Sequence, residues 1–167
     1  MDAKALVILN HIEINSKIKR IAFQIYENNV NEKEVILAGI ASNGYTLAEK
    51  LKTELEKISD ITPTLCKVTI NKKQPWEPIQ TTIAPNDYKN KSLILIDDVL
   101  NSGTTLIYGV KHFLDVPLKQ FKTAVLINRN HKKYPVKADF KGLSLSTSLH
   151  EHVNVVLDNY LFEVTLK

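Results

Sequence analysis

A short apolar run that ends in two adjacent aspartates limits the folds open to this chain more than any other feature. Leu93-Ile94-Leu95-Ile96 contains no polar residue and is followed at once by Asp97-Asp98. A continuous apolar run of this kind is typical of a strand covered on both faces, as in a parallel sheet between helices. We therefore expect helices layered around a buried sheet, with charged groups at one edge of that sheet.

Strand-like and helix-like segments alternate along the chain. Apolar residues at helical spacing predict an amphipathic helix over 11–28, capped by Asn10, and further helices over 47–58 and from Thr104 onward. The predicted strands are 35–40, 64–70, 93–96, 121–127 and a last one near 153–157. This order favours an α/β fold with a parallel sheet flanked by helices, which binds ligands at the carboxyl ends of its strands.

Length and composition set the class of protein. The 167 residues, 44% of them hydrophobic, suit one domain over 1–167 with a single core. Cys66 is the one cysteine and lies in an apolar run, which predicts a half-buried structural thiol and fits a reducing compartment. No apolar stretch approaches the ~20 residues of a membrane span, and Met1-Asp2-Ala3-Lys4 lacks the layout of a signal peptide. We therefore expect a cytoplasmic protein.

Three prolines interrupt the region 71–90. Pro75, Pro78 and Pro85 break both strand and helix regularity, so this region is expected to form a flexible arm, extended or hairpin-like. Trp76 lies on the arm, and its role as an apolar anchor or a dimer contact is open.

The residues after the most apolar strand carry the strongest chemical signal. Asp97-Asp98 is followed, after Val99-Leu100, by Asn101-Ser102-Gly103-Thr104-Thr105, where a helix begins. Backbone amides at a helix N-terminus, with hydroxyl groups beside them, suit a phosphate monoester. The aspartates can accept hydrogen bonds from sugar hydroxyls or hold Mg²⁺, directly or through water. The simpler interpretation, a helix cap alone, leaves both carboxylates without a role.

A P-loop is the main rival interpretation. Residues 39–46 match the spacing G-x-x-x-x-G-K-[ST] except at one position. Tyr45 stands where the motif has its lysine, and a phenol cannot neutralise the terminal phosphates. The hydroxyl-rich loop after Asp98 would also have no function in a P-loop protein.

Residues 93–105 closely resemble the phosphoribosyl diphosphate signature of the type I phosphoribosyltransferases. Residues 39–48 resemble the diphosphate-binding loop and following helix of that family. Residues 125–142 are similar to the base-recognition segment of one branch, the bifunctional pyrimidine operon attenuation regulator and uracil phosphoribosyltransferase. The resemblance implies the type I phosphoribosyltransferase fold, with the flexible arm at 71–90 and a small base-side hood at 128–150.

The resemblance also implies an activity. Ribose 5-phosphate would pass from phosphoribosyl diphosphate to a pyrimidine base, expected to be uracil, with release of diphosphate and with Mg²⁺ as cofactor. Catalysis would come mainly from positioning, neutralisation of the leaving group and exclusion of water. The arm would act as a closing lid, and the protein would form a dimer or a larger assembly.

The resemblance assigns residues to each part of the substrate. The catalytic and possible metal-binding pair is Asp97 and Asp98. The ribose and 5-phosphate would contact Asp97, Asp98, Asn101, Ser102, Gly103, Thr104 and Thr105. The diphosphate would contact Ala41, Ser42, Asn43 and Gly44. Phe140 would stack on the base, with the backbone of Lys141 and the side chain of Thr147 near its edge; core packing is the simpler interpretation of Phe140.

Two cations of the branch pattern are absent from this chain. The branch has an arginine in its diphosphate loop, where this chain has Ser42-Asn43, and another in its phosphate loop, where Thr104 stands. The arm offers Lys72 and Lys73, but lysine lacks the bidentate fork of arginine. A lost charge contact to a developing anion costs on the order of a hundredfold in rate. The alternative function is therefore a catalytically weak regulator that senses nucleotides or binds RNA.

The basic balance of the chain, a net charge of +4, bears on RNA binding. Arg20, Lys132 and Lys137 stand where the branch carries basic residues that contact RNA, whereas Phe23 and Leu143 stand where it is polar or basic. Contacts of lysine and arginine with phosphates are strongly salt-dependent. A solvated surface is the simpler interpretation of the same lysines.

Overall fold

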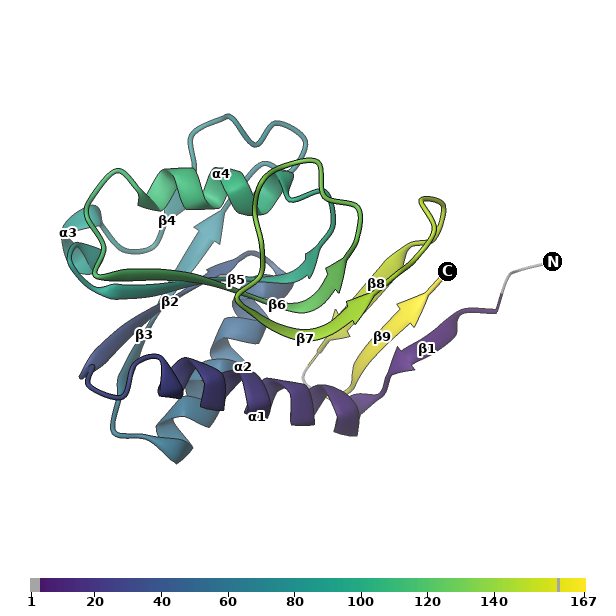
Figure 1. The fold of residues 1–167 in the computed structure, drawn as a ribbon, viewed down its shortest axis with the longest axis horizontal. Helices are drawn as coiled ribbons and strands as arrows, with labels where there is room; N and C mark the ends of the chain where they lie inside the picture. The colour runs from purple at the N-terminus through teal and green to yellow at the C-terminus, as the bar shows by residue number, and fades with distance from the viewer. Residues whose placement is uncertain (1–3, 159) are drawn as a thin grey trace.

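The computed structural model describes residues 4–158 and 160–167 (Figure 1). Met1-Asp2-Ala3 belongs to the segment that, by its sequence, lacks the layout of a signal peptide, and it lies outside the described residues. In chain order the elements are β1 (Leu6–Leu9), α1 (His11–Glu27), β2 (Glu34–Ile40), α2 (Asn43–Ile58), β3 (Thr62–Thr69), β4 (Gln80–Thr81), α3 (Pro85–Tyr88), β5 (Ser92–Leu100), α4 (Thr104–Phe113), β6 (Gln120–Arg129), β7 (Phe140–Leu145), β8 (Val153–Leu157) and β9 (Phe162–Leu166). Among these residues, no helix has the length and apolar character needed to cross a membrane.

A six-stranded sheet forms the centre of the molecule, in the order β4-β3-β2-β5-β6-β7. The last five of these strands run parallel, and the short edge strand β4 runs antiparallel to β3. Helices α1 and α2 cover one face and α4 covers the other (Figure 1), which confirms the predicted α/β fold. The chain passes from β2 outward to β3 and returns to β5 on the other side of β2. Such a reversal of strand order is where sheets of this kind bind ligands.

The buried strand β5 shows why a continuous apolar run is required. Its side chains alternate, so Ile94 and Ile96 pack with α1 and α2 while Leu93 and Leu95 pack with α4. All four side chains are fully buried. Neither face of the strand therefore meets water, and a polar residue at any of these positions would lose its hydration.

Helix α1 begins and ends where the sequence predicts. The Asn10 side chain accepts a hydrogen bond from the backbone N–H of Glu13 at 2.9 Å, and the Glu13 carboxylate accepts one from the backbone N–H of Asn10 at 2.8 Å. This reciprocal pair satisfies donors that the first turn of a helix leaves free. Asn28 forms the C-terminal cap.

Two elements extend beyond their predicted bounds next to the candidate site. β5 continues past Ile96 to Leu100, because Asp97, Val99 and Leu100 stay paired with β6. Helix α2 begins at Asn43, four residues before the predicted start, since its first turn is polar and shows no apolar periodicity. The aspartate pair therefore lies within a strand and not beyond its end, which corrects the prediction.

A second, three-stranded antiparallel sheet lies beside the carboxyl ends of β5, β6 and β7, in the order β1-β9-β8 (Figure 1). The prediction placed its last strand near 153–157, but β8 is followed by β9, and both β1 and β9 were missed. Residues 140–145 join the main sheet as β7. The small sheet is thus built from β1, β8 and β9, and the hood expected over 128–150 stays a prediction.

The region 71–90 contains more regular structure than its prolines predict. β4 pairs antiparallel with the end of β3, so the region forms an irregular hairpin, and the short helix α3 follows. Pro75 is buried, whereas the neighbouring Trp76 is 65% exposed.

Cys66 is fully buried and not half-buried as predicted. Its strand β3 lies between β4 and β2, and its side chain belongs to the core on the α4 face of the sheet. Burial raises the pKa of the thiol, which keeps it protonated. Its burial in the core supports the predicted structural role of this thiol.

Candidate functional site

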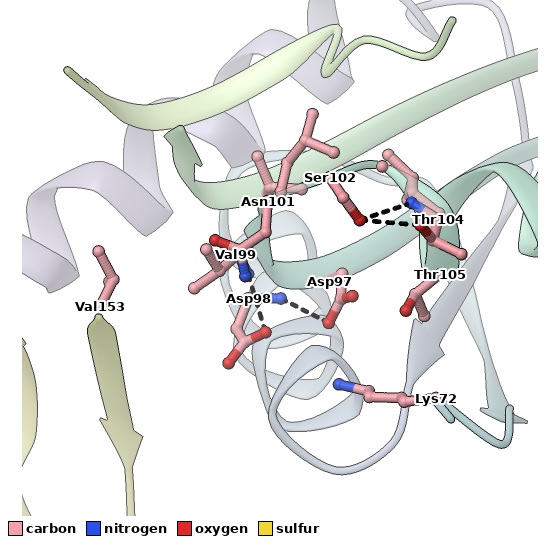
Figure 2. Close-up of a pocket in the computed structure, with 13 residues that line it drawn as sticks. Lys72, Asp97, Asp98, Val99, Asn101, Ser102, Thr104, Thr105 and Val153 are labelled. Carbon is pink, nitrogen blue, oxygen red and sulfur yellow. Dashed lines mark hydrogen bonds between the residues drawn. The ribbon is translucent and has the colours of Figure 1, made fainter. Parts of the chain in front are cut away.

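One cavity of about 290 Å³ lies at the carboxyl end of β5 (Figure 2). All of the residues predicted to contact ribose 5-phosphate line it, together with side chains from three other parts of the chain. The lining residues are Asp97, Asp98, Val99, Leu100, Asn101, Ser102, Gly103, Thr104, Thr105, Leu106, Lys72, Val125 and Val153. The cavity is therefore formed where the main sheet, the region after β3 and the small sheet meet.

The two aspartates are held by different partners. The Asp97 side chain, 5% exposed as a residue, accepts a hydrogen bond from the backbone N–H of Asp98 at 2.8 Å. Asp98 is half-buried; one of its oxygens accepts from the backbone N–H of Val99 at 2.8 Å and the other from the side-chain amide of Asn43 at 3.0 Å. Asn43 thus fixes the orientation of the Asp98 carboxylate.

Burial gives Asp97 an unusual acidity. Loss of hydration, together with the charge of Asp98, raises the pKa of Asp97 to about 8, while the Lys72 ammonium opposes this rise. Figure 2 shows the Lys72 side chain extending toward the aspartates from the segment that follows β3. Near neutral pH the Asp97 carboxyl therefore holds its proton until a cation or a set of donors stabilises its charge.

The loop before α4 leaves helical N–H groups open to the cavity. Gly103 is the N-cap of α4 and adopts a left-handed backbone with φ of 86°, which favours glycine. It carries no side chain to cap the helix. The Ser102 and Thr104 hydroxyls lie 2.8 Å apart, and Ser102 Oγ accepts from the backbone N–H of Thr104 at 3.3 Å. Hydroxyls and backbone amides therefore meet at the positive end of the helix dipole, where an anion is favoured.

The predicted diphosphate residues, 41–44, comprise the turn after β2 and the first two residues of α2. They do not line the cavity themselves, but Asn43 reaches it through Asp98. A side chain on Gly44 would place its Cβ 2.7 Å from the carbonyl oxygen of Ile96 and 2.9 Å from Cα of Asp97, so glycine lets this turn lie against β5. Asn43 also donates to the carbonyl oxygen of Val155 at 3.0 Å. This turn is thus tied to both β5 and the small sheet.

The residues predicted to bind the base are not brought together. Phe140 is 6% exposed, belongs to the core on the side of α1 and α2, and does not line the cavity. The ring therefore packs in the core, the simpler of its two interpretations, and its stacking on a base stays a prediction. Lys141 lies on the edge strand β7, where its carbonyl accepts a hydrogen bond from Arg20. Thr147 lies between β7 and β8 and is bound by Arg129.

Three residues near the cavity have no predicted role or only a weak one. Arg129 ends β6 and donates to Asn101 at 3.1 Å. The sequence offers Lys72 and Lys73 as basic residues of the arm; Lys72 lines the cavity, whereas Lys73 does not. Val153 contributes an apolar wall from β8. Arg129 stands two residues after the predicted strand 121–127, and a charged residue near the end of a buried strand, as at Asp97, is a signal that could have marked it.

The predicted RNA-binding residues lie in two places. Arg20 lines an open hollow of about 420 Å³ between α1 and β7, together with Lys17 and Lys141. Lys137 is ion-paired at 3.6 Å with Asp139, which also lines this hollow. Lys132 lies elsewhere, because the next residue along the chain donates its backbone N–H to Ser102 beside the phosphate loop. The structure therefore gathers part of the predicted basic set.

The donor set of the cavity fits Mg²⁺ shared with a ligand. No group of three or more His, Cys, Asp or Glu side chains that could hold a metal ion occurs among residues 4–158 and 160–167, so the chain offers two carboxylates and no complete cage. Mg²⁺ usually keeps several waters and binds through one or two carboxylates plus oxygens of a phosphorylated substrate. The buried acid Asp97, with its raised pKa, is a group that a nearby cation would stabilise in its charged form.

Comparison with known proteins agrees with the geometry. The sequence model of one protein family, the phosphoribosyl transferase domain, matches residues 6–159 of this chain. The bifunctional protein PyrR of Macrococcus caseolyticus is 33% identical over 159 residues, which cover 91% of each chain. The bifunctional protein PyrR of Bacillus pumilus is 34% identical over 168 residues, 95% of this chain and 93% of that protein.

Solved structures share the fold at lower identity. A hypoxanthine-guanine phosphoribosyltransferase of Bacillus anthracis superposes with a TM-score of 0.72 at 17% identity, covering 87% of this chain and 85% of that one. The hypoxanthine phosphoribosyltransferase of Trypanosoma cruzi gives a TM-score of 0.71 at 14% identity, covering 83% and 81%. Taken with the domain match and the PyrR relatives, the fold and its cavity show that this chain belongs to the type I phosphoribosyltransferase family.

Proposed function

We propose that this protein transfers ribose 5-phosphate from phosphoribosyl diphosphate to uracil and releases diphosphate. One observation carries the proposal: a single cavity holds two adjacent carboxylates and, one loop away, a helix N-terminus with hydroxyl groups around it. Carboxylates accept hydrogen bonds from ribose hydroxyls, and the helix end binds a phosphate monoester. The choice of a pyrimidine is supported by the similarity to PyrR proteins and by the resemblance of residues 125–142 to a base-recognition segment.

The chain's own residues would act mainly by positioning. Ser102, Thr104 and the first amides of α4 would hold the 5-phosphate, and Asp98, oriented by Asn43, would hold a ribose hydroxyl. Residues 41–44 would face the diphosphate. The nitrogen of the base would then attack the anomeric carbon as the bond to diphosphate breaks. Val153 and Leu106, the apolar lining from β8 and α4, would help to exclude water around a bound substrate, which would strengthen the charge interactions there.

Mg²⁺ is the proposed cofactor. When bound, it would neutralise charge on the departing diphosphate. Asp97 and Asp98 would hold it, directly or through water, together with oxygens of the substrate. Asp97 would then lose the proton that burial otherwise favours.

Lys72 is the proposed replacement for part of the missing positive charge. The turn at Ser42-Asn43 and the loop at Thr104 are uncharged, and Lys72 is the basic side chain in the lining of the described cavity. A lysine gives one point charge where an arginine gives a planar fork, so we propose slow turnover.

The activity assay tests this proposal directly. The protein is incubated with phosphoribosyl diphosphate, Mg²⁺ and one base at a time, and diphosphate release is measured. We expect release with uracil and none with hypoxanthine or guanine. Asp98→Asn should reduce the rate at least about tenfold, whereas Asp60→Asn, an exposed change after α2, should not. Tight nucleotide binding by calorimetry, without release of diphosphate for any base, would contradict the enzyme proposal.

A nucleotide-sensing or RNA-binding regulator is the second candidate function. The basic hollow formed by Lys17, Arg20 and Lys141 favours it, because lysine and arginine on one surface attract phosphates. Affinity for RNA should fall steeply as salt rises. Arg20→Gln and Lys17→Gln should weaken it, and Lys119→Gln, which removes an ion-paired lysine after α4, should not. Absence of RNA binding at low salt would remove this candidate.

The dimer or larger assembly remains a prediction. Sedimentation measured across a range of protein concentrations would test it.

A further inference from the structure

Arg129 is a buried cation one hydrogen bond away from the cavity. It is 7% exposed, and its described hydrogen-bond partners are uncharged oxygens. The guanidinium donates to the side chain of Asn101 at 3.1 Å and to the Thr147 hydroxyl at 3.0 and 2.8 Å. It also donates to the backbone carbonyls of Ser148 at 3.3 Å and Glu151 at 2.7 Å. A buried charge is expensive unless its donors are all satisfied, so these contacts hold its geometry tightly.

The partners of Arg129 belong to two separate parts of the chain. Asn101 lies in the loop that lines the cavity before α4. Thr147, Ser148 and Glu151 lie in the connection between β7 and β8, the segment 146–152, which ends beside Val153 in the cavity wall. One side chain therefore bridges the phosphate loop and the connection on the base side.

The segment 146–152 has little packing of its own. Ser148 and His150 are exposed, and Leu149 is 76% exposed. Within it, the backbone N–H of Ser148 donates to the Glu151 carboxylate at 2.6 Å and the backbone N–H of Glu151 donates to the Ser148 carbonyl at 3.3 Å. At its two ends, Asn130 donates to Ser146, and His152 exchanges backbone hydrogen bonds with Lys167. Between these two ends, Arg129 supplies the hydrogen bonds that join the middle of the segment to β6.

The Thr147 hydroxyl is held by other side chains of the protein. A hydroxyl offers one donor and two acceptor lone pairs. Its oxygen accepts twice from Arg129, and it lies 3.3 Å from Nε2 of His131, to which its proton can be donated. The resemblance placed Thr147 near the edge of the base, but this geometry gives its hydroxyl the task of holding the guanidinium.

We propose that Arg129 is a positioning residue that couples the base side of the cavity to the phosphate loop, so that uracil and ribose 5-phosphate bind more tightly together than alone. This inference rests on the proposed function, which supplies the two ligands. A base that orders the segment 146–152 fixes the guanidinium and, through it, Asn101. Linkage makes the effect reciprocal, so the phosphate ligand also favours the base.

Calorimetry on the full chain tests the coupling. The dissociation constant of ribose 5-phosphate is measured with Mg²⁺, without uracil and then with saturating uracil. In the unmodified protein, uracil should tighten binding by about fivefold or more. Arg129→Lys keeps the charge but loses the fork, so the ratio of the two constants should fall to about one. Thr147→Val removes one anchor of the guanidinium and should reduce the ratio while the chain keeps Arg129.

Asn130→Ala is the matched control. The Asn130 side chain donates to Ser146 Oγ at 2.8 Å, so it joins β6 to the same segment without reaching Asn101. Its ratio should equal that of the unmodified protein. Thermal unfolding is used to check that each variant is folded at the temperature of the titration. If Arg129→Lys is not folded, the comparison is made with Thr147→Val alone.

The outcomes separate the inference from the function beneath it. Coupling that persists in the folded Arg129 or Thr147 variants, or that is lost equally in Asn130→Ala, overturns the positioning role. Binding of ribose 5-phosphate that uracil does not change also overturns it, while the phosphate site stands. Failure of the unmodified protein to bind ribose 5-phosphate overturns the proposed function as well.

Discussion

Asp97 and Asp98 are neighbours in β5 but have different surroundings. Both line the cavity, but Asp97 is buried, whereas Asp98 is half-buried and bonded to Asn43. The difference follows from the strand, which continues to Leu100 and turns successive side chains in opposite directions. The two identical residues therefore differ in chemistry: Asp97 is a buried acid, and Asp98 is a hydrogen-bond acceptor whose orientation is fixed by Asn43.

The buried acid makes stability depend on pH. Asp97 has a pKa of about 8 when folded and an ordinary value of 3.8 when unfolded, so the folded chain holds the extra proton between these values. Stability should therefore fall as pH rises from about 4 to about 8, by on the order of a few kcal/mol. Asp97→Asn cannot ionise and should flatten this decline. Urea unfolding at several pH values measures it, and an equal decline in Asp97→Asn would contradict the assignment; exposed Asp60→Asn is the control.

Gly44 should tolerate no side chain. An added Cβ would meet backbone atoms of Ile96 and Asp97 at 2.7 and 2.9 Å, so the turn or the strand must move. Gly44→Ala should destabilise the fold by about 1–3 kcal/mol and weaken ribose 5-phosphate binding. Gly109→Ala is the matched control, because its Cβ would meet the tip of the Leu95 side chain at 2.9 Å and alanine favours the helix. Unfolding midpoints that rank the two variants in the reverse order would contradict this account.

At the level of helices and strands, the sequence predicts what the core requires. The strands over 35–40 and 121–127 contain continuous apolar runs because both faces of the main sheet are covered. The helix over 11–28 has one apolar face because it packs against one face of this sheet. β7 and β9 escaped prediction because each is short and alternates with polar residues such as Lys141 and Glu163. Propensity alone cannot tell such a strand from a loop.

The same contrast holds for the site. Residues 97–105 lie together in the sequence, so one motif predicts the acidic pair and the phosphate loop. Lys72 and Val153 line the cavity from distant segments, and Arg129 contacts the lining residue Asn101 from β6, so no local sequence pattern connects these three residues. Phe140 was assigned to the base by its place in a resembling segment, but its position in β7 puts it in the core.

The segment after β3 should act through one lysine. Lys72→Gln removes the positive charge near the aspartates, so binding of phosphoribosyl diphosphate should weaken about tenfold, and ribose 5-phosphate, which lacks the diphosphate, should be affected less. Lys73→Gln is the control, because this exposed neighbour does not line the cavity. Calorimetry with both ligands measures the difference. Equal losses in the two variants would show a general effect of charge.

At the scale of the whole molecule, the two sheets share one core. Phe162 and Val164 of β9 belong to the same buried cluster as Ile14 of α1 and Leu47 of α2. The small sheet is therefore not an independent layer. Its edge strand β8 contacts the main sheet through the cavity wall and through Asn43.

A destabilising substitution within the small sheet should lower the stability of the whole protein. Val164 is fully buried in the middle strand, so Val164→Ala should lower stability by about 1–3 kcal/mol. Because the core is shared, urea unfolding followed by circular dichroism and by Trp76 fluorescence should give one coincident transition at a lower midpoint. Leu149→Ala, an exposed change, is the control. Separate transitions for the two probes would show that the sheets unfold independently.

The pairing of β1 with β9 also sets an order of events during synthesis. Leu6 of β1 pairs with Leu166 of β9, and β9 also pairs with β8, so the strand that joins β1 to β8 is synthesised after both of them. Until then β8 lacks its partner, and the wall that Val153 contributes to the cavity is unsupported. We therefore expect a nascent chain to gain ligand affinity only after β9 has left the ribosome, which would keep a chain that still lacks β9 from sequestering the ligand.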